Sequence, residues 1–133
     1  METNLLKALS NISVLTNFKL KDIYSGPNRV NNTGTALEYF IKDALCSSSA
    51  IVGINNKNKK HSEYLTYSGN QNNPPDFIIK SGDAYEIKKI GGFKSSLQLN
   101  SSPPKNKLYS DDPKITSSCR ESDGGTWREK ELC

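Results

Sequence analysis

The architecture of this chain depends most on residues 76–90, which read Asp76-Phe77-Ile78-Ile79-Lys80-Ser81-Gly82-Asp83-Ala84-Tyr85-Glu86-Ile87-Lys88-Lys89-Ile90. Two apolar runs rich in β-branched and aromatic residues flank a polar turn, which predicts a β-hairpin with strands over 76–80 and 84–90. We expect a turn of about three residues with Gly82 in the left-handed conformation. Pro74 and Pro75 restrict the backbone just before the first strand.

The hairpin places three chemically useful side chains near one another. On a strand, residues two apart point the same way, so Glu86 and Lys88 share a face. The expected turn sets Asp76 opposite Glu86, with Cβ atoms roughly 5 Å apart. Two opposed carboxylates repel unless a cation lies between them, and their oxygen ligands suit Mg²⁺. The pattern therefore predicts a magnesium site at Asp76 and Glu86 with Lys88 beside it.

Such a cluster fits phosphodiester hydrolysis. A metal ion polarises a phosphate and acidifies bound water, and a neighbouring lysine orients that water and stabilises developing negative charge. The bare spacing, Pro-Asp followed by Glu-x-Lys, also occurs on ordinary solvated strands. A half-exposed hairpin whose Glu86 and Lys88 form only a polar face is the alternative interpretation.

Length and composition set the bounds for this prediction. The chain has 133 residues, of which 34% are hydrophobic, and a formal net charge of +4. We expect one domain, in which either the core is modest or part of the fold is missing. The small basic excess is compatible with a phosphate-rich partner but does not by itself indicate one. No stretch is long and apolar enough to span a membrane, and no signal peptide is evident. Together with an odd number of cysteines lacking metal-type spacing, these features predict a cytosolic protein with reduced thiols.

Hydrophobic spacing predicts two helices outside the hairpin. One covers residues 4–16, as a short amphipathic helix packed on the rest, and the clearer one covers 35–46. The segment 115–132 supports no assignment. Polar or turn-rich composition predicts loops for the remaining stretches, 24–34, 53–63 and 98–114.

Several segments in order resemble the NgoPII family of type II restriction endonucleases. The strongest are 69–76, 82–84 and 86–90, which contain the cluster itself. The similarity extends over roughly residues 24–130. Its further segments are Asn28-Arg29, Asn31-Asn32, Gly34, Ala36-Leu37-Glu38, Leu99-Asn100-Ser101-Ser102, Pro104-Lys105, Lys107-Leu108, Ser110-Asp111 and Cys119-Arg120.

This resemblance implies a fold, a substrate and roles. The fold is the α/β restriction-endonuclease core of the PD-(D/E)XK superfamily, a mixed β-sheet flanked by helices, and the substrate is double-stranded DNA, with GGCC as the associated site. The enzyme is usually a homodimer, and it restricts foreign DNA in the bacterial cytoplasm beside a cognate methyltransferase. Asp76 and Glu86 become ligands of Mg²⁺, and Lys88 becomes the catalytic lysine.

Glu38 has two interpretations. In related nucleases a glutamate on a helix near this position supports the metal site. Thr35 and Glu38 also have capping-box spacing, in which Glu38 would bond a backbone N–H at the start of the helix. Both interpretations stay open.

Other polar residues are candidates for DNA contact through bases or phosphates. A solvated polar loop or turn is the alternative interpretation for them. The candidates are Asn100, Ser101, Ser102, Lys105 and Lys107, and, with weaker support, Arg29, Asn32 and Arg120.

We expect no functional role for two further residues, His61 and Trp127. His61, the lone histidine, lies in a polar stretch without supporting ligands, so we expect it to be solvated. Trp127 is expected to pack against other side chains, with stacking on a DNA base as the alternative.

The end of the chain limits the prediction. Only two strong strands are evident, whereas such cores have four or five, and the resemblance stops near Thr126. We therefore expect residues 1–133 to form a single nuclease domain truncated at its C-terminus. The rival functions are a repair or recombination nuclease on the same core and a DNA-binding fragment without turnover.

Overall fold

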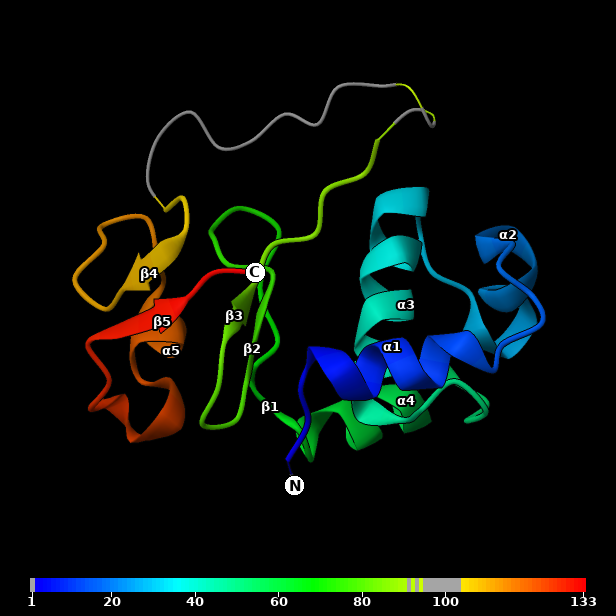
Figure 1. Cartoon of the computed structure of the whole chain (residues 1–133), viewed down its shortest axis with the longest axis horizontal. Helices are drawn as coiled ribbons and strands as arrows, with labels where there is room; N and C mark the ends of the chain where they lie inside the picture. Colours follow the sequence, from blue (N-terminus) through cyan, green and yellow to red (C-terminus); the bar gives the residue numbers. More distant parts are fainter. Residues whose placement is uncertain (1, 91, 93, 95–103) are drawn as a thin grey trace. The chain divides into compact units, whose positions relative to one another are not determined.

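The computed structural model describes residues 2–90, 92, 94 and 104–133 (Figure 1). The chain divides into two compact units, Met1–Tyr64 and Leu65–Cys133. The first unit is helical, and the second carries small antiparallel sheets with short helices. The predicted α/β class is therefore confirmed.

The helical unit is organised around α3 (Thr33–Cys46). Three other helices contact it: α1 (Leu5–Ser13), α2 (Leu20–Ile23) and α4 (Ile54–Ser62). A 3₁₀ turn, η1 (Gly26–Asn28), lies between α2 and α3. None of the helices among the described residues has the length and apolar character needed to cross a membrane.

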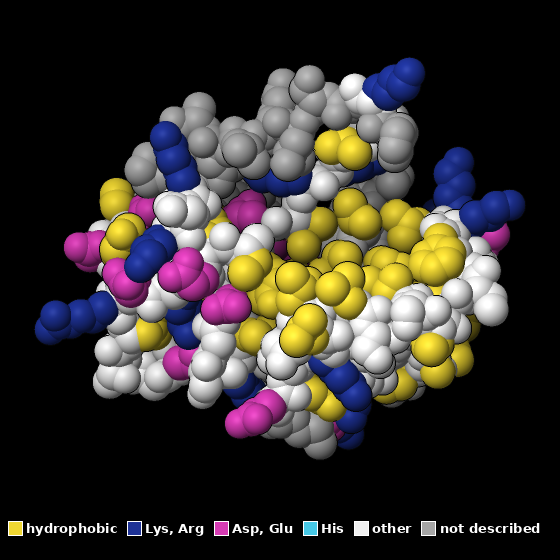
Figure 2. Space-filling model, viewed as in Figure 1, with side chains coloured by type: hydrophobic (Ala, Val, Ile, Leu, Met, Phe, Trp, Pro, Cys, Tyr) yellow, Lys and Arg dark blue, Asp and Glu magenta, His cyan; other side chains and the backbone are white. Residues whose placement is uncertain are grey.

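The predicted N-terminal helix is confirmed as α1, though it is shorter than expected. Asn4 caps it, because its side-chain oxygen accepts a hydrogen bond from the N–H of Lys7 at 3.0 Å. Ala8 is buried, but Leu6 and Leu9 remain 77% and 54% exposed. Apolar side chains accordingly gather on the face shown in Figure 2. The expected packing of α1 is thus only partly realised within its unit.

The helix predicted over 35–46 is confirmed as α3, and it begins two residues earlier. Asn32 is the N-cap, with its side-chain oxygen 2.8 Å from the N–H of Thr35. Ser47 ends the helix in the left-handed conformation, with φ 54°. The start of α3 is therefore set by an asparagine cap.

The prediction of a solvated loop over 53–63 is wrong, because this stretch forms α4. Lys57 and His61 are both buried on this helix. Their spacing of four places them on the same face. The buried face of α4 is thus partly polar, and a search for apolar periodicity does not detect such a helix.

The second unit contains a three-stranded antiparallel sheet in the order β1-β2-β3. Its strands are β1 (Leu65–Tyr67), β2 (Phe77–Ile79) and β3 (Ala84–Tyr85). The hairpin is confirmed, but its second strand ends at Tyr85, so the expected strand over 86–90 is wrong. Ala84 also forms a parallel bridge with Leu132. The C-terminal residues thereby line the other edge of β3.

A second sheet pairs β4 (Lys107–Tyr109) antiparallel with β5 (Glu129–Glu131). Strand β4 lies inside the stretch predicted as loop, so that prediction is wrong for 107–109. Three residues are too few for an alternating pattern to be recognised in the sequence. The short helix α5 (Ser117–Arg120) and the 3₁₀ segment η2 (Ser122–Gly125) connect the two strands.

A buried apolar cluster joins the elements of this unit. Burying each large apolar side chain contributes roughly 1.5–3 kcal/mol. Trp127 packs against the cluster, as predicted. The buried members are Tyr67, Ile78, Ala84, Leu108, Ile115 and Cys119.

The turn of the β2–β3 hairpin differs from the expectation. Ser81, with φ 55°, is left-handed, and Gly82 is not. A Cβ atom on Gly82 would lie 2.6 Å from Cγ1 of Ile79, so glycine is needed there for close packing. The N–H of Ser81 donates to both carboxylate oxygens of Asp123 at 3.0 Å. Lys130 bonds the same carboxylate at 2.6 Å and the carbonyl of Gly82 at 2.8 Å, which braces the turn.

Candidate active site

Asp76 directly precedes β2, and a backbone hydrogen bond fixes its position. Its N–H donates to the carbonyl of Tyr85 at 2.9 Å. The peptide bond between Pro74 and Pro75, just upstream, is cis. Gly69, with φ 85°, passes so close that an added Cβ would lie 1.9 Å from the carbonyl oxygen of Asp76. Only glycine allows this approach, so Gly69 is required for the local path of the chain at Asp76.

The side chain of Asp76 reaches the segment that follows β3. Its Oδ2 accepts a hydrogen bond from the N–H of Ile87 at 2.5 Å. Ile87 lies between Glu86 and Lys88. The strand register ends with the pair Phe77 and Tyr85, and beyond it the side chain of Asp76 contacts the backbone of the Glu-x-Lys segment. The predicted proximity of Asp76 to the Glu-x-Lys segment is therefore present.

Glu86 and Lys88 lie on the same side even though the strand has ended. The N–H of Glu86 donates to the carbonyl of Cys133 at 2.9 Å, which anchors this residue to the C-terminal segment. Nζ of Lys88 lies 3.8 Å from Oε2 of Glu86, and their side chains are 40% and 17% exposed. Lys88 is exposed, and the distance is at the outer limit for an ion pair, so the pair contributes little to folding stability. Its two side chains stay accessible from solvent.

The carboxylates of Asp76 and Glu86 are the type of ligand that suits a hard divalent cation, if that cation needs only one or two ligands from the protein. Asp76 and Glu86 supply carboxylate oxygens, the ligand type that Mg²⁺ prefers. Nowhere in the described ranges do three or more histidine, cysteine or acidic residues form a group that could hold a metal. Structural zinc needs such a group of four ligands, whereas Mg²⁺ is commonly held by one or two carboxylates and water. The two residue types therefore match magnesium better than structural zinc, and binding of a metal ion by Asp76 and Glu86 stays a prediction.

Glu38 lies on α3 in the helical unit. Nζ of Lys42 approaches its carboxylate to 3.2 Å across one helical turn. The capping-box interpretation is wrong, because α3 begins at Thr33 with Asn32 as its cap. A supporting role for Glu38 at a metal site stays a prediction.

Several predicted DNA contacts have structural partners. Lys107 lies 2.8 Å from Glu129 and 3.7 Å from Glu131 across the β4–β5 pair. The hydrogen bond to Glu129 raises the pKa of Lys107. Arg120 donates to the carbonyl oxygens of Ser110 and Asp112 at 2.7 and 3.2 Å. Both cations therefore stabilise the loops and strands around them, and contact with DNA by either one stays a prediction.

The remaining predicted DNA contacts fall into two groups. Lys105 and Arg29 are exposed, and the side-chain oxygen of Asn32 is occupied as a helix cap. The three polar residues at 100–102 lie outside the described residues. DNA contact by any of these side chains stays a prediction.

A second charged cluster, unexpected from the sequence, is sealed inside the helical unit. Asp43 of α3 is 1% exposed. Its Oδ2 lies 2.8 Å from Nζ of Lys57, and its Oδ1 lies 2.8 Å from Nε2 of His61. Ser48 and Tyr24 donate hydroxyl hydrogen bonds to the same carboxylate at 2.5 and 2.8 Å. The expectation of a solvated His61 is therefore wrong.

Hydrogen bonding in this sealed cluster fixes the charge of Asp43. Burial by itself would raise the pKa of this carboxyl. The hydrogen bonds from His61, Lys57, Ser48 and Tyr24 outweigh burial and lower the pKa of Asp43 below its ordinary value. Burial and the nearby carboxylate raise the pKa of Tyr24. Asp43 thus stays ionised, and Tyr24 stays a donor.

The sealed cluster has serine, histidine and aspartate but not the geometry of a catalytic triad. Nε2 of His61 lies 3.1 Å from Oγ of Ser48 as well as 2.8 Å from Asp43. A triad uses opposite ring nitrogens for these two contacts. Ser48 is also fully buried, so no substrate reaches it. We assign this cluster a structural role.

Comparisons with known proteins add an independent finding. The family model described as NgoPII restriction endonuclease matches residues 3–133. The chain is 36% identical over 129 residues to the type II restriction enzyme NgoPII of Neisseria gonorrhoeae. The matched region is 97% of this chain but 45% of that relative, so the chain spans less than half the relative's length. No solved structure matches the chain.

Proposed function

This chain belongs to the NgoPII restriction endonuclease family, and from that membership we propose that it carries the catalytic cluster of a type II site-specific deoxyribonuclease. The reaction is hydrolysis of a phosphodiester bond in duplex DNA. Because the chain spans 45% of its relative, activity of this chain alone is part of the proposal.

One observation supports the proposal most strongly. The carboxylate of Asp76 accepts the N–H of Ile87 at 2.5 Å, and the residues on either side of Ile87 are Glu86 and Lys88. A carboxylate from one segment thus meets a Glu-x-Lys segment from the next. The same cluster is accessible to solvent, as a site for a DNA backbone has to be.

We assign each residue a role. Asp76 and Glu86 would hold Mg²⁺, which when bound supplies charge neutralisation at the phosphate and a more acidic water. The N–H of Ile87 keeps Asp76 in one orientation, and Lys88 positions the attacking water and stabilises the charge that develops on the phosphate. The water oxygen forms the new bond to phosphorus, the phosphorus–oxygen ester bond breaks, and the departing oxygen takes a proton.

We infer a biological setting from what is expected of the family. We propose restriction of foreign DNA in the bacterial cytoplasm, at a short site for which GGCC is the first candidate, with a cognate methyltransferase protecting the host. We also propose that the active form is a homodimer, because a two-fold enzyme matches a palindromic site.

Two other functions remain as alternatives. A repair or recombination nuclease would use the same cluster on a different DNA structure. The other alternative is a DNA-binding protein without turnover.

The deciding experiment is incubation of the chain with plasmid DNA and Mg²⁺, followed by gel electrophoresis. We expect discrete fragments from the wild type and at least about a 100-fold loss with Asp76→Ala. Asp83→Ala is the matched control, because it removes a carboxylate from the same hairpin outside the cluster. Equal cleavage by wild type and Asp76→Ala would contradict the assigned site.

The pattern of products separates the alternatives. Smeared or structure-dependent nicks would favour the repair nuclease. Binding of a labelled duplex without product at any Mg²⁺ concentration would favour the DNA-binding protein without turnover.

A further inference from the structure

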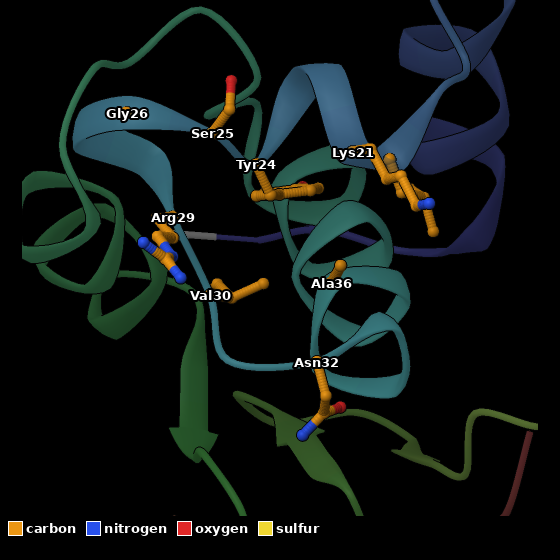
Figure 3. A pocket seen from close by; sticks show the side chains of 9 residues that line it. Lys21, Tyr24, Ser25, Gly26, Arg29, Val30, Asn32 and Ala36 are labelled. Carbon is orange, nitrogen blue, oxygen red and sulfur yellow. The ribbon is translucent and has the colours of Figure 1, made fainter.

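The helical unit contains a cavity that is lined by none of the proposed catalytic residues Asp76, Glu86 and Lys88. Its volume is about 430 Å³, and it is bounded by α2, η1 and the start of α3. This volume falls in the range of sites that hold small ligands, roughly 300–1,000 Å³. Figure 3 shows Lys21 and Arg29 at opposite sides of the view, with Tyr24, Val30 and Ala36 between them.

The charge of the cavity is positive. Lys21 and Arg29 line it, and none of its described lining residues is an aspartate or glutamate. Within the described part of the chain, neither cation forms an ion pair with an aspartate or glutamate. Two cations without acidic partners at one cavity favour an anionic ligand.

The wall between the two cations is apolar and held firmly. Tyr24 is 5% exposed, and its hydroxyl donates to Asp43 at 2.8 Å, so the phenol ring is anchored by the sealed cluster behind it. Val30 and Ala36 complete the apolar surface. The side-chain oxygen of Asn32 is already occupied by Thr35, which leaves its NH₂ group as a donor. The ligand should therefore join an anionic group to an apolar body with acceptor atoms.

We propose that this cavity binds one nucleotide of a DNA strand. Arg29 and Lys21 each contact one of the two phosphates that flank this nucleotide, and its base packs against Tyr24, Val30 and Ala36 between them. A base within a stacked duplex cannot enter such a cavity, so the bound nucleotide is unpaired or turned out of the helix. This inference rests on the proposed function only in taking DNA as the ligand. It gives Arg29 and Asn32, both predicted DNA contacts, a shared site.

The test is binding of a labelled single-stranded oligonucleotide in EDTA, measured by fluorescence anisotropy over a range of salt concentrations. Val30→Trp fills the cavity without changing charge, and we expect about tenfold weaker binding, similar to the loss of one base–aromatic contact. The double variant Lys21→Gln/Arg29→Gln should also bind about tenfold more weakly. Its salt dependence should fall by about 0.7 in logarithmic slope for each phosphate that is no longer neutralised.

The matched control is Lys7→Gln/Lys19→Gln, which removes two exposed lysines from the same unit outside the cavity. Its binding should change about twofold at most. Wild-type binding by a folded Val30→Trp would overturn the proposal. If circular dichroism shows that Val30→Trp is unfolded, the two double variants decide, and equal losses in both would overturn it.

Competition identifies what the cavity recognises. Deoxyadenosine monophosphate should displace the oligonucleotide at concentrations at least about tenfold lower than inorganic phosphate does. Equal displacement by the two would overturn the base contact. Because EDTA prevents metal-dependent cleavage, these results are independent of the Asp76→Ala test, and either proposal can fail while the other holds.

Discussion

The two charged clusters use similar residues for different ends. In the helical unit, the carboxylate of Asp43 has four side-chain partners and is sealed from solvent. In the other unit, Asp76 is oriented by one backbone N–H, and the neighbouring lysine is 40% exposed. Burial and the number of protein partners therefore separate a structural ion cluster from one suited to a metal ion and a substrate.

The largest expected effect tests the sealed cluster. Lys57→Met should lower the free energy of unfolding by about 3–5 kcal/mol, because it leaves a buried carboxylate without its main counter-charge. Urea unfolding followed by circular dichroism measures this change. Lys59→Met, an exposed lysine on the same helix, is the control and should shift stability by no more than about 0.5 kcal/mol. Similar changes in the free energy of unfolding of both variants would show that the buried ion cluster does not stabilise the fold more than an exposed lysine does.

A smaller effect should appear in acid. The pKa of Asp43 is lower in the folded chain than its ordinary value of 3.8. Its contribution to stability is therefore complete above that value and is lost as pH falls through the folded pKa. Unfolding midpoints in urea between pH 6 and 3 should decrease, and Asp43→Asn should flatten this decrease. Asp22→Asn, an exposed carboxylate of the same unit, should leave it intact. An unchanged acid profile in Asp43→Asn would contradict the assigned role.

The smallest effect on stability is expected in the exposed cluster. Lys88→Met should change the free energy of unfolding by no more than about 0.5 kcal/mol, since the pair with Glu86 is long and solvated. The same variant should lose about 100-fold in DNA cleavage if Lys88 stabilises developing charge. Lys89→Met, the exposed neighbour, should keep both properties. A large loss of stability with normal cleavage would mean that Lys88 is structural.

Local patterns predicted the elements whose buried faces are apolar. Helix α3 was recognisable because its apolar side chains follow the helical period, and the hairpin around residues 77–85 because two apolar runs flank a polar turn. Helix α4 escaped prediction because Lys57 and His61 occupy its buried face. The left-handed residue of the hairpin turn was also misassigned. Glycine at 82 is needed for contact with Ile79, which a turn rule based on φ does not consider.

Local spacing and residue identity were enough to establish the α/β class, the resemblance to a family, and the candidate cluster of Asp76, Glu86 and Lys88. Two other groupings became visible only in the folded chain. Asp43 collects Lys57 and His61 in a sealed network, and Lys21 and Arg29 line one cavity. The Asp43 network joins positions 14 or more residues apart in the sequence. The cavity forms only because the chain turns back between Lys21 and Arg29. The physical reason is that the burial and the partners of a charged side chain belong to the packed chain and not to its local sequence.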